Sequence, residues 1–262
     1  MEQLARIPDE VLHSKWREIA PLIDVLATRI GESEPFPVVT GSAFTGDDRG
    51  AAPYSVTYVA NACLFSAIDH LHALKALVWD ARLLHTSAPA TLARSAIENA
   101  VTGLWVISPA SRNERISRSL RWYAQDARDQ HRATAHFSAV DLAGKLERLG
   151  AIAEVRGISA SSAISNFTIT SVFKELKAAG REAAEFEWRL ASGFAHGRSW
   201  ASMGVLESEE LPLGDGDNVV LRLTNSDQMA LYFVLKALHS IEQLLQRREF
   251  LAGLRTHDAS VG

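Results

Sequence analysis

Apolar residues recur three or four positions apart along most of the chain, and this spacing predicts α-helices. The pattern covers residues 8–30, 54–86, 90–107, 110–135, 139–150, 170–179, 181–196 and 227–252. Residue types at the boundaries agree with it. Pro89 suits a first helical turn, and Gly180 suits the position after a helix end. We expect Thr170 and Ser226 to be N-caps of the helices that follow them.

Three stretches lack helical spacing. Residues 31–53 are rich in Gly, Pro and Asp, which predicts a long loop that orders as a lid. Residues 157–170 are small and polar, which predicts a second loop. In residues 200–224 two short segments flank the sequence Gly-Asp-Gly-Asp at 214–217. Such residues favour a tight turn, so this stretch predicts a β-hairpin, with the only strands we expect.

The pattern as a whole predicts an all-α fold, a bundle of six to eight helices with one small β-hairpin at about 201–224. We expect a single domain over 1–262. Residues 1–53 supply an N-terminal helix and a long loop, and residues 54–199 and 225–253 supply the bundle core. The long apolar face of 54–86 favours pairing with a second copy, so we expect a homodimer.

Composition narrows the class of protein. Hydrophobic residues make up 47% of the chain and charged residues 22%, which is typical of a globular protein with a core. The formal net charge of −4 means that any contact with nucleic acid must come from a local basic patch. Cys63 is the single cysteine, which favours a reducing compartment. With no secretory signal and no apolar run of about 18 residues, we expect a cytoplasmic protein without a membrane partner.

The predicted helix that ends at Gly197 carries the main candidate for chemistry. At 100° per residue, Arg189 and His196 lie on one face, and Ser192 lies within about 60° of both. The strip therefore has a guanidinium, a hydroxyl and an imidazole. Arg189 has to reach back, because seven residues span about 10.5 Å along the axis. The alternative is structural: His196 donates to a carbonyl at the helix end, and Arg189 pairs with a carboxylate.

The segment from Arg189 to His196, RLASGFAH, resembles the Arg-x4-6-His motif of the HEPN superfamily (higher eukaryotes and prokaryotes nucleotide-binding). That resemblance implies a helical bundle that dimerises and cleaves RNA without a metal. Arg189 would hold the scissile phosphate, and His196 would help to move the proton of the 2′-hydroxyl. The chain departs from the pattern at Leu190, where the family often has a polar residue. The segments ARSAIENAVTGLW and SGFAHG also resemble uncharacterised bacterial helical proteins, without a known activity.

Arg94 and Glu98 lie one turn apart in a predicted helix that is otherwise apolar nearly all round. Since buried charges need partners, we expect a buried ion pair, linked to Arg189 or to His70. In the functional interpretation, Glu98 orients His196 or Arg189. In the structural one, the pair fixes the register of the helices.

Two further clusters have a structural alternative as well. Asp69, His70 and His72 point in different directions on one helix, so we expect core or interface histidines and no metal site. A run of arginines steps by three along residues 110–135, near Trp122 and Tyr123. Such a run is typical either of a surface that contacts a phosphate backbone or of a solvent-exposed face with ion pairs. The arginines that we expect to bind nucleic acid are Arg115, Arg118 and Arg121.

No dinucleotide-binding, Walker or nucleophile-elbow motif is present in the sequence, so we expect no cofactor. Two function classes follow. One is a HEPN-like, metal-independent ribonuclease or RNA-binding protein, of the kind found in defence or toxin systems. The other is a non-enzymatic helical interaction or scaffold protein. A small-molecule ligand under the 31–53 loop is a third possibility.

Overall fold

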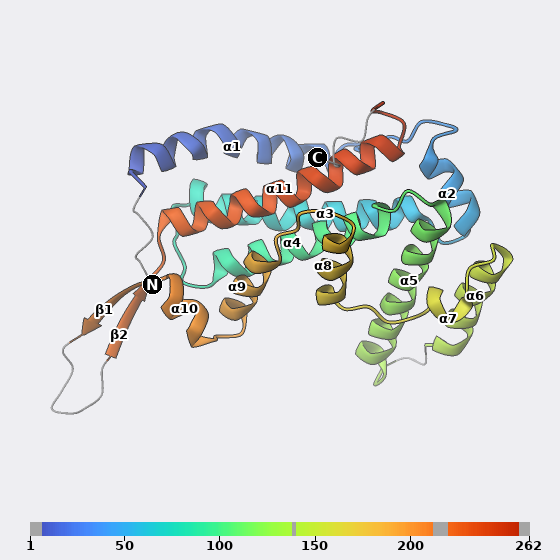
Figure 1. Ribbon diagram of the computed structural model, residues 1–262. Helices are drawn as coiled ribbons and strands as arrows, with labels where there is room; N and C mark the ends of the chain where they lie inside the picture. Colours follow the sequence, from blue (N-terminus) through green and yellow to red (C-terminus); the bar gives the residue numbers. More distant parts are fainter. Residues whose placement is uncertain (1–6, 138–139, 212–219, 257–262) are drawn as a thin grey trace. The chain divides into compact units, whose positions relative to one another are not determined.

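The computed structural model describes residues 7–137, 140–211 and 220–256, and in these ranges the chain is helical apart from one hairpin (Figure 1). The described residues form eleven α-helices, a π-helical segment and two strands. The predicted all-α fold with a small hairpin is confirmed. Helices outnumber the six to eight expected because short ones form at 43–51, 160–163 and 199–205.

The chain forms two compact units. Unit 1 comprises Met1–Pro35, Phe65–Glu98 and Ala184–Ile241, and unit 2 comprises Phe36–Leu64, Asn99–Ala183 and Glu242–Gly262. Three helices contribute residues to both units: α3 (Val56–Lys75), α4 (Ala88–Ile107) and α11 (Asp227–Leu251). The expected single domain over 1–262 stays a prediction.

Unit 1 also contains α1 (Asp9–Arg29), the π-helical segment η1 (Ala76–Asp80), α9 (Glu185–Ala195) and α10 (Ser199–Val205). Its hairpin pairs β1 (Glu207–Leu211) with β2 (Val220–Thr224). Large apolar side chains at helical spacing form its core, since each of these helices has one apolar face. They include Trp16, Ile19, Ile23, Ile68, Leu71, Leu74, Ile97, Phe194 and Phe233.

Unit 2 contains α2 (Ala43–Ala51), α5 (Arg112–Thr134), α6 (Leu142–Val155), α7 (Ala160–Ala163) and α8 (Ile169–Ala178). Helix α5 packs against α2, α6 and α7 (Figure 1). Apolar side chains of α5 and of the other helices of this unit are fully buried. The core of the unit includes Phe44, Leu64, Leu104, Trp105, Ile116, Leu120, Phe173, Leu176 and Leu244.

The predicted loop over 31–53 is wrong in its second half, which forms helix α2. Ser42 caps this helix by accepting a hydrogen bond from the backbone N–H of Thr45. The glycines that suggested a loop have a packing role instead. A Cβ at Gly50 would lie 2.7 Å from Nη1 of Arg156, so glycine lets that guanidinium approach the helix closely. The first half is held by the fully buried Arg248, which donates to the carbonyl of Phe36.

The hairpin is shorter than predicted. Strands β1 and β2 pair antiparallel from Glu207↔Thr224 to Leu211↔Val220. The segment before them, which we expected to be extended, is helix α10. Its Ala201 is buried and packs against Gly193 of α9. The predicted Gly-Asp-Gly-Asp turn at 214–217 lies outside the described residues.

Other helices also end at residues that differ from the predicted ones. The predicted helix 54–86 stops at Lys75 and continues as η1 to Asp80, after which Arg82 adopts a φ of 56°. The helix expected to close at Gly150 runs on to Val155. Gly150 leaves room for α7, because a Cβ there would lie 3.3 Å from that of Ala160. No helix within the described ranges is both long and apolar enough to cross a membrane.

Candidate functional site

Helix α9 ends as predicted, with His196 as its C-cap and Gly197 in the left-handed region at a φ of 61°. The N–H of Gly197 donates to the carbonyl of Phe194, and that of Arg198 donates to the carbonyl of Gly193. This Schellman arrangement satisfies carbonyls at the helix end. It leaves the His196 side chain exposed, and the described residues give that side chain no hydrogen-bond partner.

Ser192 belongs to a polar cluster with residues of α4, all within unit 1. The Nε of Arg94 donates to Ser192 Oγ at 2.8 Å, and its Nη2 lies 3.1 Å from Glu98 Oε2. Trp188 Nε1 donates to the same carboxylate oxygen at 2.9 Å. The predicted pairing of Arg94 with Glu98 is confirmed. The expectation that the pair is buried is wrong, because both side chains remain about one-third exposed (27% and 35%).

The links predicted for the Arg94–Glu98 pair differ from those in the structure. Ser192 and Trp188 are its partners, whereas the His70 ring contacts the carbonyl of Ser66 in its own helix. The pair therefore holds α9 against α4 through hydrogen bonds that bridge the two helices. Helix spacing alone does not specify these partners.

Arg189 lies apart from His196. Its guanidinium pairs with Glu185, one turn toward the N-terminus of α9, at 2.7 Å. His196 lies at the opposite end of the helix, and within the described residues no hydrogen bond or ion pair joins the two side chains. The structure therefore brings Arg94, Glu98 and Ser192 together, and it leaves Arg189 and His196 at separate places on the exposed face.

A second polar cluster in unit 1 was not predicted. Glu187 accepts a hydrogen bond from the Tyr232 hydroxyl at 2.6 Å and lies 3.2 Å from Lys236 Nζ. Burial alone raises the pKa of the Glu187 carboxyl, but the hydrogen bonds from Tyr232, the backbone and Lys236 outweigh it and lower that pKa overall. Burial and the neighbouring carboxylate raise the pKa of Tyr232. The cluster anchors the first turn of α9 to α11.

One of the histidines that we expected to be structural, His72, lies near a buried lysine. Lys75 is 6% exposed and pairs with Asp24 and Asp80, each at 2.8 Å. Burial lowers the pKa of Lys75, but the two carboxylates outweigh it, so that the pKa is raised overall. His72 lies 3.5 Å from Asp24. Across the described ranges, no three His, Cys, Asp or Glu side chains gather as ligands for a metal ion.

The arginines predicted to bind nucleic acid are in unit 2, where each has partners within the chain. Arg115 is buried and forms a two-pronged ion pair with the fully buried Asp47, at 2.6 and 2.9 Å. It also donates to the carbonyls of Pro109 and Ala110. Since Asp47 also pairs with Arg112, this cluster holds α2 against the start of α5.

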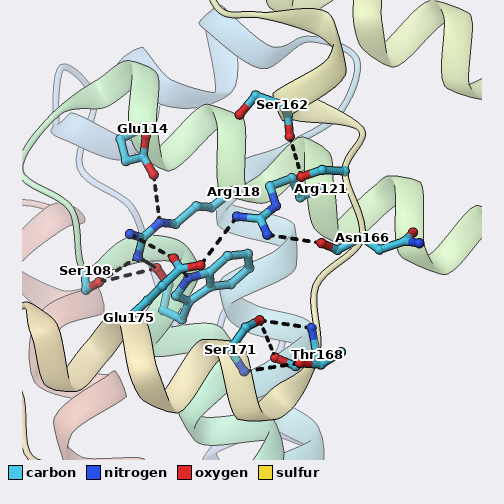
Figure 2. A network of polar contacts seen from close by, with 11 residues as sticks. Ser108, Glu114, Arg118, Arg121, Ser162, Asn166, Thr168, Ser171 and Glu175 are labelled. Atoms are coloured by element: carbon cyan, nitrogen blue, oxygen red, sulfur yellow. Dashed lines mark hydrogen bonds and ion pairs between the residues drawn. The ribbon is translucent and has the colours of Figure 1, made fainter.

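Figure 2 shows the partners of the next two arginines. Arg118 donates to Glu114 and to the carbonyl of Trp105, and it lies 3.3 Å from Glu175. Arg121 pairs with Glu175 at 3.8 Å and donates to the carbonyl of Asn166. Their side chains are only 14% and 16% exposed. These guanidiniums hold α4, α5 and α8 together, so they present little charge to an external phosphate.

Two exposed residues just after α9 were not among the predicted site residues. Arg198 is exposed and has no side-chain partner within the described part of the chain. Trp200 is 57% exposed, although indole rings are usually covered. The sequence HGRSW contained the signal, because a cation and an aromatic residue follow His196 directly.

Comparisons with models of known protein families, with curated proteins and with solved structures find no match to this chain.

Proposed function

We propose that this chain is a HEPN-like, metal-independent endoribonuclease whose active site is the C-terminal turn of α9. The observation that carries the proposal is the exposed imidazole of His196, which has no partner among the described residues and lies one helical turn after a Ser192 that Arg94 fixes in place. An accessible imidazole within reach of a substrate hydroxyl suits proton transfer. The structural alternative for His196, a hydrogen bond to a carbonyl at the helix end, has no such bond to support it in the described residues.

The proposed reaction uses the RNA itself as nucleophile. His196 takes the proton of a 2′-hydroxyl, and the 2′-oxygen then attacks the adjacent phosphorus. The bond to the 5′-oxygen breaks, leaving a 2′,3′-cyclic phosphate on one product and, after protonation, a 5′-hydroxyl on the other. A guanidinium at the phosphate would stabilise the charge that develops there.

In this proposal Arg189 supplies that guanidinium after leaving Glu185. The Arg189–Glu185 pair is exposed, with 53% and 36% of the side chains accessible. Exposed pairs at this helical spacing contribute only about 0.3–0.5 kcal/mol, so a phosphate can replace the carboxylate at small cost. Arg94 is less available, because Ser192, Glu98 and the Trp188 ring already surround its guanidinium.

The proposal is tested by cleavage of single-stranded RNA in the presence of a chelator. We expect the wild type to cleave and His196→Ala to lose at least about 100-fold in rate, as general acid–base groups contribute. Arg189→Gln should also lose activity, whereas Glu185→Gln should retain it, because that change frees the guanidinium. His136→Ala is the matched control, since His136 is also exposed but belongs to unit 2. Equal cleavage by wild type and His196→Ala, or none by either, would contradict the proposal.

The proposal includes a homodimer, because the HEPN resemblance implies an active cleft lined by two copies. Sedimentation equilibrium should give twice the mass of the chain. Mixing His196→Ala with Arg189→Gln chains would then restore part of the activity if each cleft takes one residue from each copy.

A second function, as a non-enzymatic interaction protein, is favoured by one observation on α1. Val11, Leu22 and Val25 fall on one face of this helix and are 55%, 50% and 65% exposed. Apolar side chains that line up on one exposed face often mark a protein contact. If the wild type neither binds nor cleaves RNA, while Val25→Glu abolishes its self-association, this second function is the better one.

A further inference from the structure

The indole of Trp200 lies on the face of α9 that carries the proposed active residues. Gly193 of α9 is buried, and a Cβ at that position would lie 2.9 Å from Trp200 Cζ2 and 2.5 Å from the Cβ of Ala201. The ring can approach the helix only because residue 193 is glycine. Positions 189 and 196 are four residues before and three residues after Gly193, so both are on the same face. The indole therefore packs on the side of α9 to which positions 189 and 196 belong.

This ring is both anchored and accessible. One edge packs over Gly193, while 57% of the residue remains open to solvent. Phe186, seven residues before Gly193 on the same face of α9, is 63% exposed. Met203, three residues after Trp200 on α10, is 58% exposed. An aromatic surface held in this way can receive a flat ring without first having to be ordered.

The charged residues closest to Trp200 in the sequence suit an anion. From residue 188 to residue 206 the chain has two arginines and one histidine and no Asp or Glu. Arg198 is exposed and has no side-chain partner among the described residues, and it lies between His196 and Trp200 in the sequence. An aromatic face with cations beside it is the arrangement that proteins use for single-stranded nucleic acid, in which the bases are free to stack.

We propose that Trp200 stacks on an unpaired base of a single-stranded RNA, and that Arg198 contacts a neighbouring phosphate. The inference rests on the proposed ribonuclease function and adds its substrate class. Trp200 would place the nucleotide next to the scissile bond beside His196, and duplex RNA would bind poorly because its bases are already stacked.

The experiment measures binding separately from cleavage. Fluorescence anisotropy follows a short, labelled RNA with 2′-O-methyl groups, which the proposed reaction cannot cleave because the nucleophilic hydroxyl is blocked. The full chain is compared with Trp200→Phe, which keeps an aromatic face, and Trp200→Leu, which keeps apolar bulk alone. Phe137→Ala is the matched control, because Phe137 is 86% exposed and belongs to unit 2. Circular dichroism verifies that each variant is folded.

We expect Trp200→Leu to bind about tenfold more weakly or worse, Trp200→Phe to lose less, and Phe137→Ala to bind like the wild type. Arg198→Gln should reduce the dependence of log Kd on log salt by about 0.7, the value for one phosphate on a single strand. Equal affinity of wild type and Trp200→Leu would overturn the inference, and so would equal binding of duplex and single strand.

The outcomes also separate this inference from the proposed function. If the wild type cleaves RNA through His196 but Trp200→Leu still binds normally, the nuclease proposal stands and the stacking inference fails. If the wild type binds RNA through Trp200 but cleaves none, the nuclease proposal fails while Trp200 remains a base-binding residue. If Trp200→Leu changes only the oligomeric state, the surface is a protein contact and the inference is overturned.

Discussion

At the scale of single residues, burial decides what an arginine of this chain can do. Arg115 is buried against Asp47, whereas Arg198 is exposed without a partner in the described ranges. A guanidinium that already donates to a buried carboxylate and to two backbone carbonyls has few donors left for a ligand. The exposed cations near the end of α9 are therefore better candidates for substrate contact than the arginine run of α5.

The Asp47–Arg115 pair gives a prediction about stability. Asp47→Asn should lower the free energy of unfolding by about 3–5 kcal/mol, because it leaves the buried guanidinium of Arg115 without its counter-charge. Urea denaturation followed by circular dichroism measures this change. Glu18→Gln is the control, since the Lys15–Glu18 pair is exposed and should change the free energy by less than about 1 kcal/mol. Similar losses in the two variants would mean that the Asp47 pair is not a buried ion pair in solution.

The candidate site could be predicted only where its contacts are local in sequence. Arg94 and Glu98 pair as expected, because i,i+4 spacing places them together on any helix. Ser192 is 98 positions from Arg94, and Asp47 is 68 positions from Arg115, so neither partner follows from a local pattern. Arg189 pairs with Glu185, a carboxylate at the same i,i+4 spacing that is visible in the sequence.

At the scale of secondary structure, the start of α8 shows what a cap adds to the apolar pattern. Thr168 and Ser171 form a capping box, in which each side chain accepts a hydrogen bond from the backbone N–H of the other residue (Figure 2). The predicted cap, Thr170, lies two residues further on, inside the first turn. Ser and Thr occur at 168, 170 and 171, so composition alone does not choose among them.

The two threonines at this helix start form a matched pair of substitutions. Thr168→Ala should destabilise the chain by about 1 kcal/mol, because the N–H of Ser171 loses its acceptor. Thr170→Ala should cost less, since within the described residues its hydroxyl contacts only that of Thr168. Thermal denaturation of both variants ranks them. A larger loss for Thr170→Ala would mean that Thr170, the cap predicted from the sequence, is the N-cap of this helix.

The long elements could be predicted and the short ones could not. Helices such as α1, α4, α5 and α11 have enough turns for an apolar face to be recognised. Helices α2, α7 and α10 have nine residues or fewer and contain small or glycine residues, so their pattern is that of loops. They are stabilised by tertiary contacts, such as that of Ala201 with Gly193, which sequence spacing does not encode.

At the scale of the whole molecule, groups from both units contribute to alkaline sensitivity. Burial raises the pKa of the Cys63 thiol from 9.0 to about 12. Burial, together with nearby charges that include Tyr58 and Asp48, raises the pKa of Tyr123. Burial and Glu187 do the same for Tyr232. A group whose pKa is higher in the folded state binds its proton more tightly there, so its stabilisation is complete below the unfolded pKa and is lost as the pH rises above it.

The free energy of unfolding should therefore be level near neutral pH and fall as the pH rises above about 9, where unfolded Cys63 begins to ionise. One group contributes a slope of at most about 1.4 kcal/mol per pH unit, and the tyrosines add to it above 10.0. At acid pH, Glu187 has the opposite effect on the free energy of unfolding. Its pKa is lowered below 4.5 by folding, so its stabilisation is present above that value and is lost as the pH falls.

Urea denaturation at a series of pH values measures this profile, and Cys63→Ala isolates the thiol. The variant should be less stable than the wild type at neutral pH, because it leaves a small cavity in a buried position. Its free energy should nevertheless fall less steeply than that of the wild type above pH 9.0, since it has no thiol to ionise. Parallel curves for the two proteins would mean that the Cys63 thiol ionises as readily in the folded chain as in the unfolded one. That result would contradict the burial of Cys63, of which only 3% is accessible.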